Sequence, residues 1–256
     1  MEYHRIISLS PSLTRMIIDL GAADTLAGVT SYHPPMKKKV PVAGNLVNLN
    51  LEKIMILDPE IILLSREDNP TQFTERLDTL PLATREFSGY STFSSICTTY
   101  REMSIITGTQ KTAERKLSEY RKQRQKMVNT DQEELTVLFL LSDRPFVAAA
   151  ENSFIGNILK DAGGQNIITT RRHQYPVINA ELIIREDPQV IITTSETTVS
   201  RFRELLGEKH THLQALRNDA VKHIAYDPVT YYTPGDYVKS LAEIQELFNK
   251  VTATMQ

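Results

Sequence analysis

Aromatic, cationic and polar side chains gather in short segments that follow apolar runs of the sequence. One such segment, "SYHPP", contains Tyr32 and His33, and a later one, "DPVTYYTPGD", contains Tyr231 and Tyr232. Aromatic rings offer contact area to a large flat ligand, and the polar groups beside them can fix its orientation. These residue types in this pattern indicate a site that binds a bulky, flat molecule with polar edges.

The chain contains none of the short motifs that carry common catalytic chemistry. No GxGxxG or GxxxxGK[ST] loop follows the first apolar run, and neither GxSxG nor HExxH occurs. His210 and His212 could contribute to a metal site, but they lie in a segment typical of a polar surface loop. The predicted binding loops offer only His33 and His173, too few for a bare transition-metal ion. We therefore expect no enzyme activity, no catalytic residue, no resident cofactor and no metal site.

Composition excludes several other classes of protein. The formal net charge is -2 over 256 residues, with both signs interspersed. Nucleic-acid binding needs a clustered basic excess, so nucleic acid is not an expected partner. The single cysteine, Cys97, cannot form an intramolecular disulfide and is expected to be a buried small side chain on a helix. No run reaches the about 18 consecutive apolar residues that a membrane span needs.

One segment of the sequence occurs in two similar copies. "NLEKIMILDPEIILLS" begins at Asn50 and "NAELIIREDPQVIITTS" begins at Asn179, an offset of 179 − 50 = 129 residues. The same offset pairs acidic residues further along the chain: Glu67 with Glu196, and Glu75 with Glu204. A repeat on this scale is too long for a solenoid unit. The sequence therefore predicts two similar lobes in tandem.

Each copy predicts a short helix followed by a buried strand. The helix over residues 51–57 ends before Asp-Pro, because proline lacks a backbone donor and disfavours helical geometry in its predecessor. The apolar, β-branched run that follows is typical of a strand buried on both faces. Further strands are expected over 5–10, 136–142 and 222–227, with helices over 13–20, 154–162 and 238–248. This alternation predicts parallel βαβ layers in both halves, and hence an α/β fold of two pseudo-symmetric lobes with mainly parallel central sheets.

The joint between the two halves reads as two consecutive helices, over residues 92–108 and 109–129. The second is rich in strong helix formers and contains neither Gly nor Pro. A helix of about 20 residues spans about 30 Å, the width of a small domain. We therefore expect lobes over 1–108 and 132–256, joined by a rigid helical strut over 109–131.

Three stretches of the sequence carry a resemblance to a known family. They are "RIISLSPSLTRMIIDLGAADTLAGVTSYHPP", "VPVAGNLVNLNLEKIMILDPEIILLS" and "HLQALRNDAVKHIAYD", and the late "YYTPGDYVKSLAEIQELF" extends the match. Together they resemble the class III periplasmic substrate-binding proteins of ABC importers, which carry cobalamin, ferric siderophores or haem. The resemblance implies two α/β lobes linked by one long helix, with the ligand held in a cleft between them.

The ligand that the resemblance favours is a bulky metal chelate, cobalamin or another corrinoid, because "GVTSYHPP" is similar to the tyrosine-proline loop of the cobalamin carriers. Tyr32 lies where those carriers have a ring-contacting tyrosine and where haem-binding members have an iron-ligating one. This chain has no tryptophan, which cobalamin carriers often place in the cleft. Haem and ferric siderophores therefore stay open as ligands, as does a corrinoid-handling protein that has no role in transport.

In open α/β sheets, ligands bind beyond the carboxyl ends of the strands. The loops expected there include "SPS", "SYHPP", "AGN" and "SRED" in the first half, and "SDRPF", "RRHQYP", "TSE" and "DPVTYYTPGD" in the second. The ligand-binding residues predicted from them are Ser10, Ser12, Tyr32, His33, Asn45, Arg66, Arg144, Arg171, Tyr175, Ser195, Tyr231 and Tyr232.

The resemblance also implies a partner, a two-fold symmetric ABC permease dimer in the membrane. In the family, one acidic residue on each lobe docks onto arginines of the permease. The repeat offers two candidate pairs for this role, Glu67 with Glu196 and Glu75 with Glu204, and the family pattern does not choose between them. We expect a monomer that is periplasmic or anchored on the outer face of the membrane. The first residues show no basic segment followed by an apolar one, so we expect no export signal within this sequence.

Overall fold

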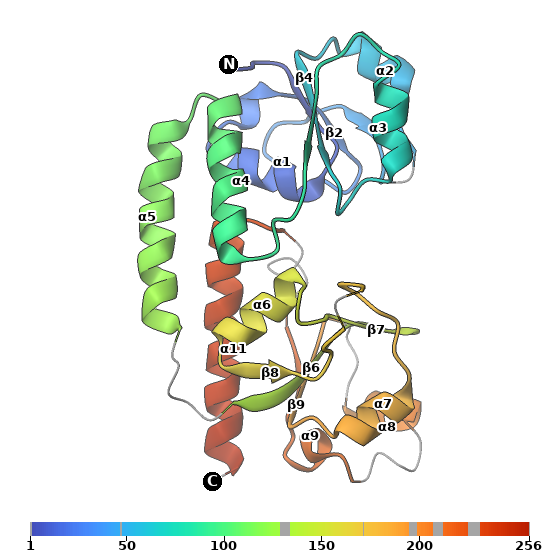
Figure 1. Ribbon diagram of the computed structural model, residues 1–256, viewed down its shortest axis with the longest axis vertical. Coiled ribbons are helices and arrows are strands. Elements are labelled where there is room, and N and C mark those ends of the chain that lie inside the picture. The colour runs from blue at the N-terminus through green and yellow to red at the C-terminus, as the bar shows by residue number, and fades with distance from the viewer. Residues whose placement is uncertain are drawn as a thin grey trace. The chain divides into compact units, whose positions relative to one another are not determined.

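The computed structural model describes residues 2–46, 48–128, 134–170, 172–194, 199–206, 212–224 and 231–255. The chain divides into two compact units, each with an α/β fold (Figure 1). The first comprises Met1–Tyr120 with Tyr231–Pro234, and the second comprises Arg121–Thr230 with Gly235–Gln256. The predicted fold class, two α/β lobes with mainly parallel sheets, is confirmed. Tyr231–Pro234, which we had assigned to the second lobe from the sequence, cluster with the first unit.

The sheet of the first unit is wholly parallel. Its order is β3-β2-β1-β4-β5, formed by β1 (Ile6–Ser8), β2 (Leu26–Thr30), β3 (Val42–Gly44), β4 (Ile61–Ser65) and β5 (Thr84–Phe87). Every neighbouring pair is parallel. The loops that follow all five strands therefore leave the sheet at the same edge, which we call the carboxyl edge.

Helices cover both faces of this sheet. Figure 1 shows α2 (Leu51–Ile56) and α3 (Thr71–Leu77) on one side, with α1 (Pro11–Asp19) and α4 (Phe93–Ile106) on the other. A short 3-10 helix, Ala23–Thr25, precedes β2. The core beneath α2 and α3 consists of buried aliphatic and aromatic side chains, among them Ile7, Ile54, Ile62, Leu64 and Phe73. Burial of such side chains contributes about 1.5–3 kcal/mol each to stability, and it fixes the sheet on which the loops stand.

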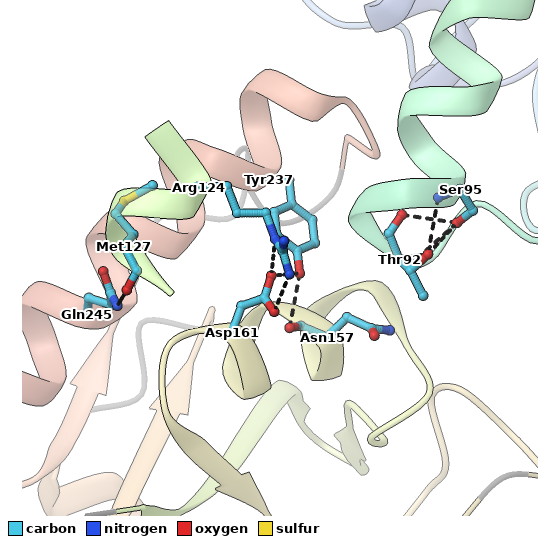
Figure 2. A network of polar contacts seen from close by, with 8 residues as sticks. All are labelled: Thr92, Ser95, Arg124, Met127, Asn157, Asp161, Tyr237 and Gln245. Atoms are coloured by element: carbon cyan, nitrogen blue, oxygen red, sulfur yellow. Dashed lines mark hydrogen bonds and ion pairs between the residues drawn. The ribbon is translucent and has the colours of Figure 1, made fainter. Parts of the chain in front are cut away.

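Polar caps determine where these helices begin. Ser10 caps α1, and its hydroxyl accepts a hydrogen bond from the amide of Leu13 at 3.3 Å. Thr92 caps α4 in a reciprocal capping box with Ser95, which Figure 2 shows. Such caps satisfy backbone donors that the first helical turn leaves unpaired. Cys97 lies on α4 and is buried, as its sequence context predicted.

The sheet of the second unit is parallel except for one hairpin. Its order is β10-β9-β6-β7, with β8 paired to β6, from β6 (Leu135–Asp143), β7 (Phe146–Ala148), β8 (Gly164–Asn166), β9 (Val190–Thr193) and β10 (Val221–His223). The antiparallel pair of β6 and β7 is compatible with the mainly parallel sheets that the sequence predicted. Only Arg144 and Pro145 separate these strands, and a connection of two residues can join only antiparallel neighbours.

The helices of the second unit also lie on both faces of its sheet (Figure 1). They are α6 (Phe154–Asp161), α7 (Ala180–Glu186), α8 (Val199–Leu206), α9 (Gln214–Arg217) and α11 (Pro234–Met255). Figure 1 shows α6 and α11 on one side, with α7 and α8 on the other. Within the described residues, no helix combines the length and apolar character that a membrane span requires.

The sequence repeat corresponds to a structural repeat. The pair α2 and β4 in the first unit has its counterpart in α7 and β9 in the second. Asp58 follows α2 with φ 45°, and Asp187 follows α7 with φ 41°. Both take the left-handed conformation that Asp tolerates better than most residues, and a proline comes next in each case. A left-handed aspartate followed by proline therefore leads from the helix to the strand in both copies.

Helix α5 (Gln110–Met127) confirms the long helix predicted at the joint, and each half of it is held by a carboxylate. In the first unit, Lys116 Nζ lies 2.7 Å from Asp19, which also accepts a hydrogen bond from the buried Tyr100 hydroxyl. In the second, Arg124 binds Asp161 through two hydrogen bonds of 2.6 and 2.7 Å (Figure 2). The hydroxyl of Tyr237 donates to Asp161 at 2.6 Å. The rigidity that we expect of this helix stays a prediction.

Candidate ligand-binding site

The carboxyl edge of the first sheet brings together most of the residues that the sequence predicted for this half. Ser10 and Ser12 follow β1, and Tyr32 and His33 follow β2. Asn45 follows β3 and Arg66 follows β4. Because the strands are parallel, four loops far apart in sequence meet at one edge. We refer to these loops as the carboxyl-edge loops.

Tyr32 has an aromatic ring that is exposed to solvent. Its side chain is 61% exposed, so the ring is not packed away against Pro34 or Pro35. The loop is set by the amide of His33, which donates to the carbonyl of Thr30 at 3.2 Å. His33 Nδ1 lies 2.7 Å from the carbonyl oxygen of Pro34 and donates a hydrogen bond to it.

A hollow of about 250 Å³ lies between Ser31, which follows β2, and the residues at the end of β3. Asn45 lines it, and the side-chain oxygen of Asn45 accepts a hydrogen bond from the amide of Asn48 at 2.7 Å. Gly44 adopts φ 156°, and a Cβ there would meet the carbonyl of Asn48. The loop after β3 therefore requires glycine, and it presents the hollow in a fixed shape.

The loop after β4 forms a network of hydroxyls and carboxylates with its neighbours. The hydroxyl of Ser10 donates to the carboxylate of Asp68. The hydroxyl of Tyr90 donates to Ser65 Oγ, and Ser65 in turn donates to Glu67 Oε2 at 3.1 Å. Glu67 Oε1 accepts the amide of Gly89 at 2.6 Å. The network joins the ends of β1, β4 and β5.

Burial changes the acidity of two groups in this network. Burial raises the pKa of Asp68, and the nearby charge of Glu67 raises it further, while hydrogen bonds from Ser10 and Ser65 oppose the change. Burial also raises the pKa of Tyr90 well above its usual value, and the charges of Asp68 and Glu67 act in the same direction. Tyr90 therefore remains a neutral donor at physiological pH.

Neither Asp68 nor Tyr90 was among the predicted site residues. Asp68 lies in the "SRED" loop, so position at the end of β4 could have nominated it. Tyr90 follows β5, a strand that we did not recognise from the sequence. Arg66, which we did predict, pairs with Glu86 at 2.6 Å and so has a structural partner of its own.

Tyr231 and Tyr232 lie against the same loops of the first unit. The amide of Tyr232 donates to Ser12 Oγ at 3.4 Å, and its ring meets Tyr90 edge-on, with ring centroids 5.8 Å apart. The guanidinium of Arg15 lies 5.8 Å from the centroid of the Tyr231 ring. The predicted roles of Tyr231 and Tyr232 in ligand binding stay predictions.

The predicted residues of the second unit lie beside the β6–β7 hairpin. Arg144 is exposed in the turn, preceding a cis proline. Tyr175 is half-buried in the segment that runs along β7, where the amide of Ala148 donates to the carbonyl of Pro176 at 3.0 Å. Arg171, Ser195 and Glu196 lie outside the described residues, so their predicted roles stay predictions.

The two candidate docking pairs differ in their surroundings. The carboxylate of Glu67 accepts hydrogen bonds from the amide of Gly89 and the hydroxyl of Ser65. Glu75 on α3 is exposed between the buried Phe73 and Leu77. Glu204 on α8 is exposed in the same way, between the buried Phe202 and Leu206. Neither Glu75 nor Glu204 pairs with another residue in the described parts of the chain.

The described residues contain no group of three or more His, Cys, Asp or Glu side chains arranged to hold a metal ion. The carboxyl-edge loops offer aromatic faces, hydroxyls and carboxylates instead. This combination can bind a bulky ligand through ring contacts and hydrogen bonds.

Two α/β units with such loops are typical of two-domain binding proteins. The chain belongs to the periplasmic binding protein family, whose model matches residues 6–227.

Relatives of this chain include vitamin B12-binding proteins. The vitamin B12-binding protein of Vibrio cholerae serotype O1 is 24% identical over 234 residues, covering 90% of this chain and 84% of that protein. The vitamin B12-binding protein of Pectobacterium atrosepticum is 26% identical over 199 residues, covering 73% and 70%.

Solved structures share the fold over nearly the whole chain. The periplasmic vitamin B12 binding protein BtuF of Vibrio cholerae has a TM-score of 0.85 at 22% identity, covering 97% of this chain and 98% of that one. The periplasmic heme binding protein HutB of Vibrio cholerae has a TM-score of 0.82 at 19% identity, covering 95% and 98%.

Proposed function

We propose that this protein captures a bulky metal chelate, cobalamin or another corrinoid, and delivers it to an ABC importer. The exposed ring of Tyr32, set among hydroxyl and amide groups at the carboxyl edge, is the observation that carries the proposal. A flat macrocycle can stack on such a ring while its polar edge meets the hydroxyls. The vitamin B12-binding relatives support the choice of a corrinoid.

Haem is the second candidate ligand. A phenol such as that of Tyr32 can ligate ferric iron, and no residue of the described chain forms a hydrogen bond with it. The heme-binding protein with the same fold supports this alternative. A ferric siderophore would use the same ring and hydroxyl contacts without ligation.

For the partner, we propose a permease dimer that binds Glu75 and Glu204. Both are exposed on equivalent helices that follow equivalent strands, so a pseudo-symmetric carrier would present one carboxylate from each unit. Carboxylates of this kind form strong bidentate pairs with arginine. Glu67 is the weaker candidate because its two oxygens already accept hydrogen bonds. The family supports a periplasmic location.

Isothermal titration calorimetry with three ligands tests the proposal. Cyanocobalamin should bind one-to-one with a Kd of about 1 µM or tighter, and haemin and a ferric hydroxamate siderophore should bind more weakly. Tight binding of haemin without binding of cyanocobalamin would replace the corrinoid by haem. Absence of binding to all three would contradict the proposed function.

A further inference from the structure

Asp68 has acceptor capacity that the described protein groups leave unused. A carboxylate offers about four acceptor positions. One oxygen of Asp68 accepts the hydroxyl of Ser10, and Ser65 is the other hydroxyl that interacts with this carboxylate, so about two of these positions stay open. Asp68 is only partly buried, at the carboxyl edge that we propose for the ligand. It can therefore accept a further hydrogen bond from outside the protein.

The surroundings of Asp68 hold it in place. Its own amide donates to the carbonyl of Ser65 at 3.2 Å. The next residue, Asn69, donates to the carbonyl of Leu9 at 2.8 Å and accepts the amide of Ser65 at 2.9 Å. The loop after β4 is thus tied to the loop after β1, and the position of the Asp68 carboxylate is fixed before any ligand arrives. A preorganised acceptor loses little entropy on binding.

The geometry points to Asp68 as a specificity-determining residue: it accepts an N–H donor on the periphery of the chelate and disfavours chelates whose periphery carries carboxylates. This inference rests on the proposed function. Corrinoids of the cobalamin type carry amide side chains, whereas haem carries two carboxylates. A ligand carboxylate placed against Asp68 would also face the neighbouring charge of Glu67, and such like-charge contacts are unfavourable in a partly buried site.

The inference gives a reason for an ionisable carboxylate at position 68, where burial makes the charged form unfavourable. Burial raises the pKa of Asp68, which means that the ionised form is less favourable in the folded protein than in the unfolded chain. Stability from this group is therefore greater when the carboxyl is protonated, and it falls as the pH rises through the pKa of the folded state. A neutral side chain of the same shape should give a protein at least as stable at neutral pH, so stability does not account for the carboxylate.

The test compares two corrins on three proteins by calorimetry: wild type, Asp68→Asn, and the control Asp78→Asn, which changes an exposed carboxylate after the end of α3. The probes are cyanocobalamin and a corrin whose side-chain amides have been hydrolysed to carboxylates. Wild type and Asp78→Asn should prefer cyanocobalamin. In Asp68→Asn that preference should shrink by about tenfold, chiefly because the affinity for the carboxylate corrin increases. A tenfold change is the scale of one hydrogen bond to a charged group.

A pH series separates specificity from a merely structural role. The titratable groups that face Asp68 are Glu67 in its own loop and Tyr90 after β5, while Arg15 of α1 lies against Tyr231. Wild-type affinity for cyanocobalamin should fall as acidification protonates Asp68, and that of Asp68→Asn should change less. Asp68→Ser provides a second variant should the first fail to fold.

The outcomes are distinguishable. If wild type binds cyanocobalamin and both Asp68 variants keep its preference within twofold, this inference is overturned and the proposed function stands. If wild type binds neither corrin, the proposed function fails and this inference fails with it.

Discussion

Asp19 and Asp161 occupy equivalent positions, each as the last residue of its helix and each two residues before a glycine with positive φ. Each carboxylate accepts a hydrogen bond from a buried tyrosine and binds a cation of α5, Lys116 in one case and Arg124 in the other. Each half of α5 is therefore held by the same arrangement, an aspartate that contacts a buried tyrosine and a cation of the helix. This repetition extends the structural repeat to α1 and α6.

Loss of the second anchor should loosen the C-terminal half of α5. In Asp161→Asn, Arg124 loses its charged partner and Tyr237 loses an ionised acceptor, at a cost of about 2 kcal/mol in the free energy of unfolding. Urea denaturation measures this, and hydrogen exchange should show faster exchange over Arg121–Met127. Arg185→Gln, which breaks an exposed pair with Glu186, should cost under about 0.5 kcal/mol. Equal costs for the two variants would contradict the anchoring role.

Alkaline conditions should destabilise the protein steeply. Burial raises the pKa of Tyr90, Tyr100 and Tyr237, whereas the unfolded chain loses these protons near pH 10. Above that pH the folded state holds more protons than the unfolded state, so stability is lost at about 1.4 kcal/mol per pH unit for each tyrosine. Denaturation between pH 8 and 11 measures the slope.

A single replacement tests the assignment of that slope. Tyr237→Phe should lower the free energy of unfolding by about 1 kcal/mol at neutral pH through the lost hydrogen bond. Above pH 10 it should also reduce the loss of stability by about 1.4 kcal/mol per pH unit, the contribution of one tyrosine. Phe248→Leu alters a buried ring that carries no titratable proton, so it should lower stability without changing the slope. A slope unaffected by Tyr237→Phe would show that this phenol ionises equally in both states.

Removal of the Tyr32 ring should weaken ligand binding without affecting the fold. Tyr32→Ala should reduce the affinity for cyanocobalamin by at least about 1 kcal/mol, the scale of a lost aromatic contact. Its stability should change by less than about 0.5 kcal/mol because the ring is exposed. Ile56→Ala removes an even more exposed side chain, 74% accessible, on α2, and should leave the affinity unchanged. Unchanged affinity in purified Tyr32→Ala would remove this residue from the site.

Charge reversal of the proposed docking pair should separate transport from binding. The double variant Glu75→Lys with Glu204→Lys should reduce cobalamin uptake in cells, since arginines of the permease would then face lysines. Its ligand affinity should match that of wild type, because both residues are exposed on helices behind the loops.

The repeat supplies a matched control for that experiment. Glu52 and Glu181 are also exposed, and they lie at equivalent positions in the first turns of α2 and α7. Reversal of this pair should leave uptake near the wild-type rate. Equal loss in both double variants would indicate a general effect of surface charge, and no loss in the first would exclude Glu75 and Glu204 as docking residues.

The sequence predicted the features that depend on local patterns. The repeated helix, Asp-Pro and strand could be read from two short segments, and the structure gives Asp58 and Asp187 the same left-handed conformation. The long helix at the joint followed from a run of strong helix formers. The hairpin between β6 and β7 was missed because β7 has three residues, too few to show a pattern.

Contacts between distant parts of the chain could not be predicted in this way. Ser10 and Asp68 are 58 positions apart, and Ser12 and Tyr232 are 220 apart. No periodicity or motif links such residues. Ser10 and Asp68 meet because the parallel strands β1 and β4 bring their following loops to one edge. The sequence could nominate Ser10, Ser12 and Tyr232 separately, but the network that joins them with Asp68 and Tyr90 required the structure.

Hydrogen exchange with and without cyanocobalamin tests the central claim, that the carboxyl-edge loops bind a corrinoid, most directly. We predict slower exchange on ligand addition in peptides that contain Tyr32, Asp68 and Tyr232, with little change around β10 and the C-terminal half of α11. Absence of protection anywhere, or protection confined to that second region, would contradict the proposed site.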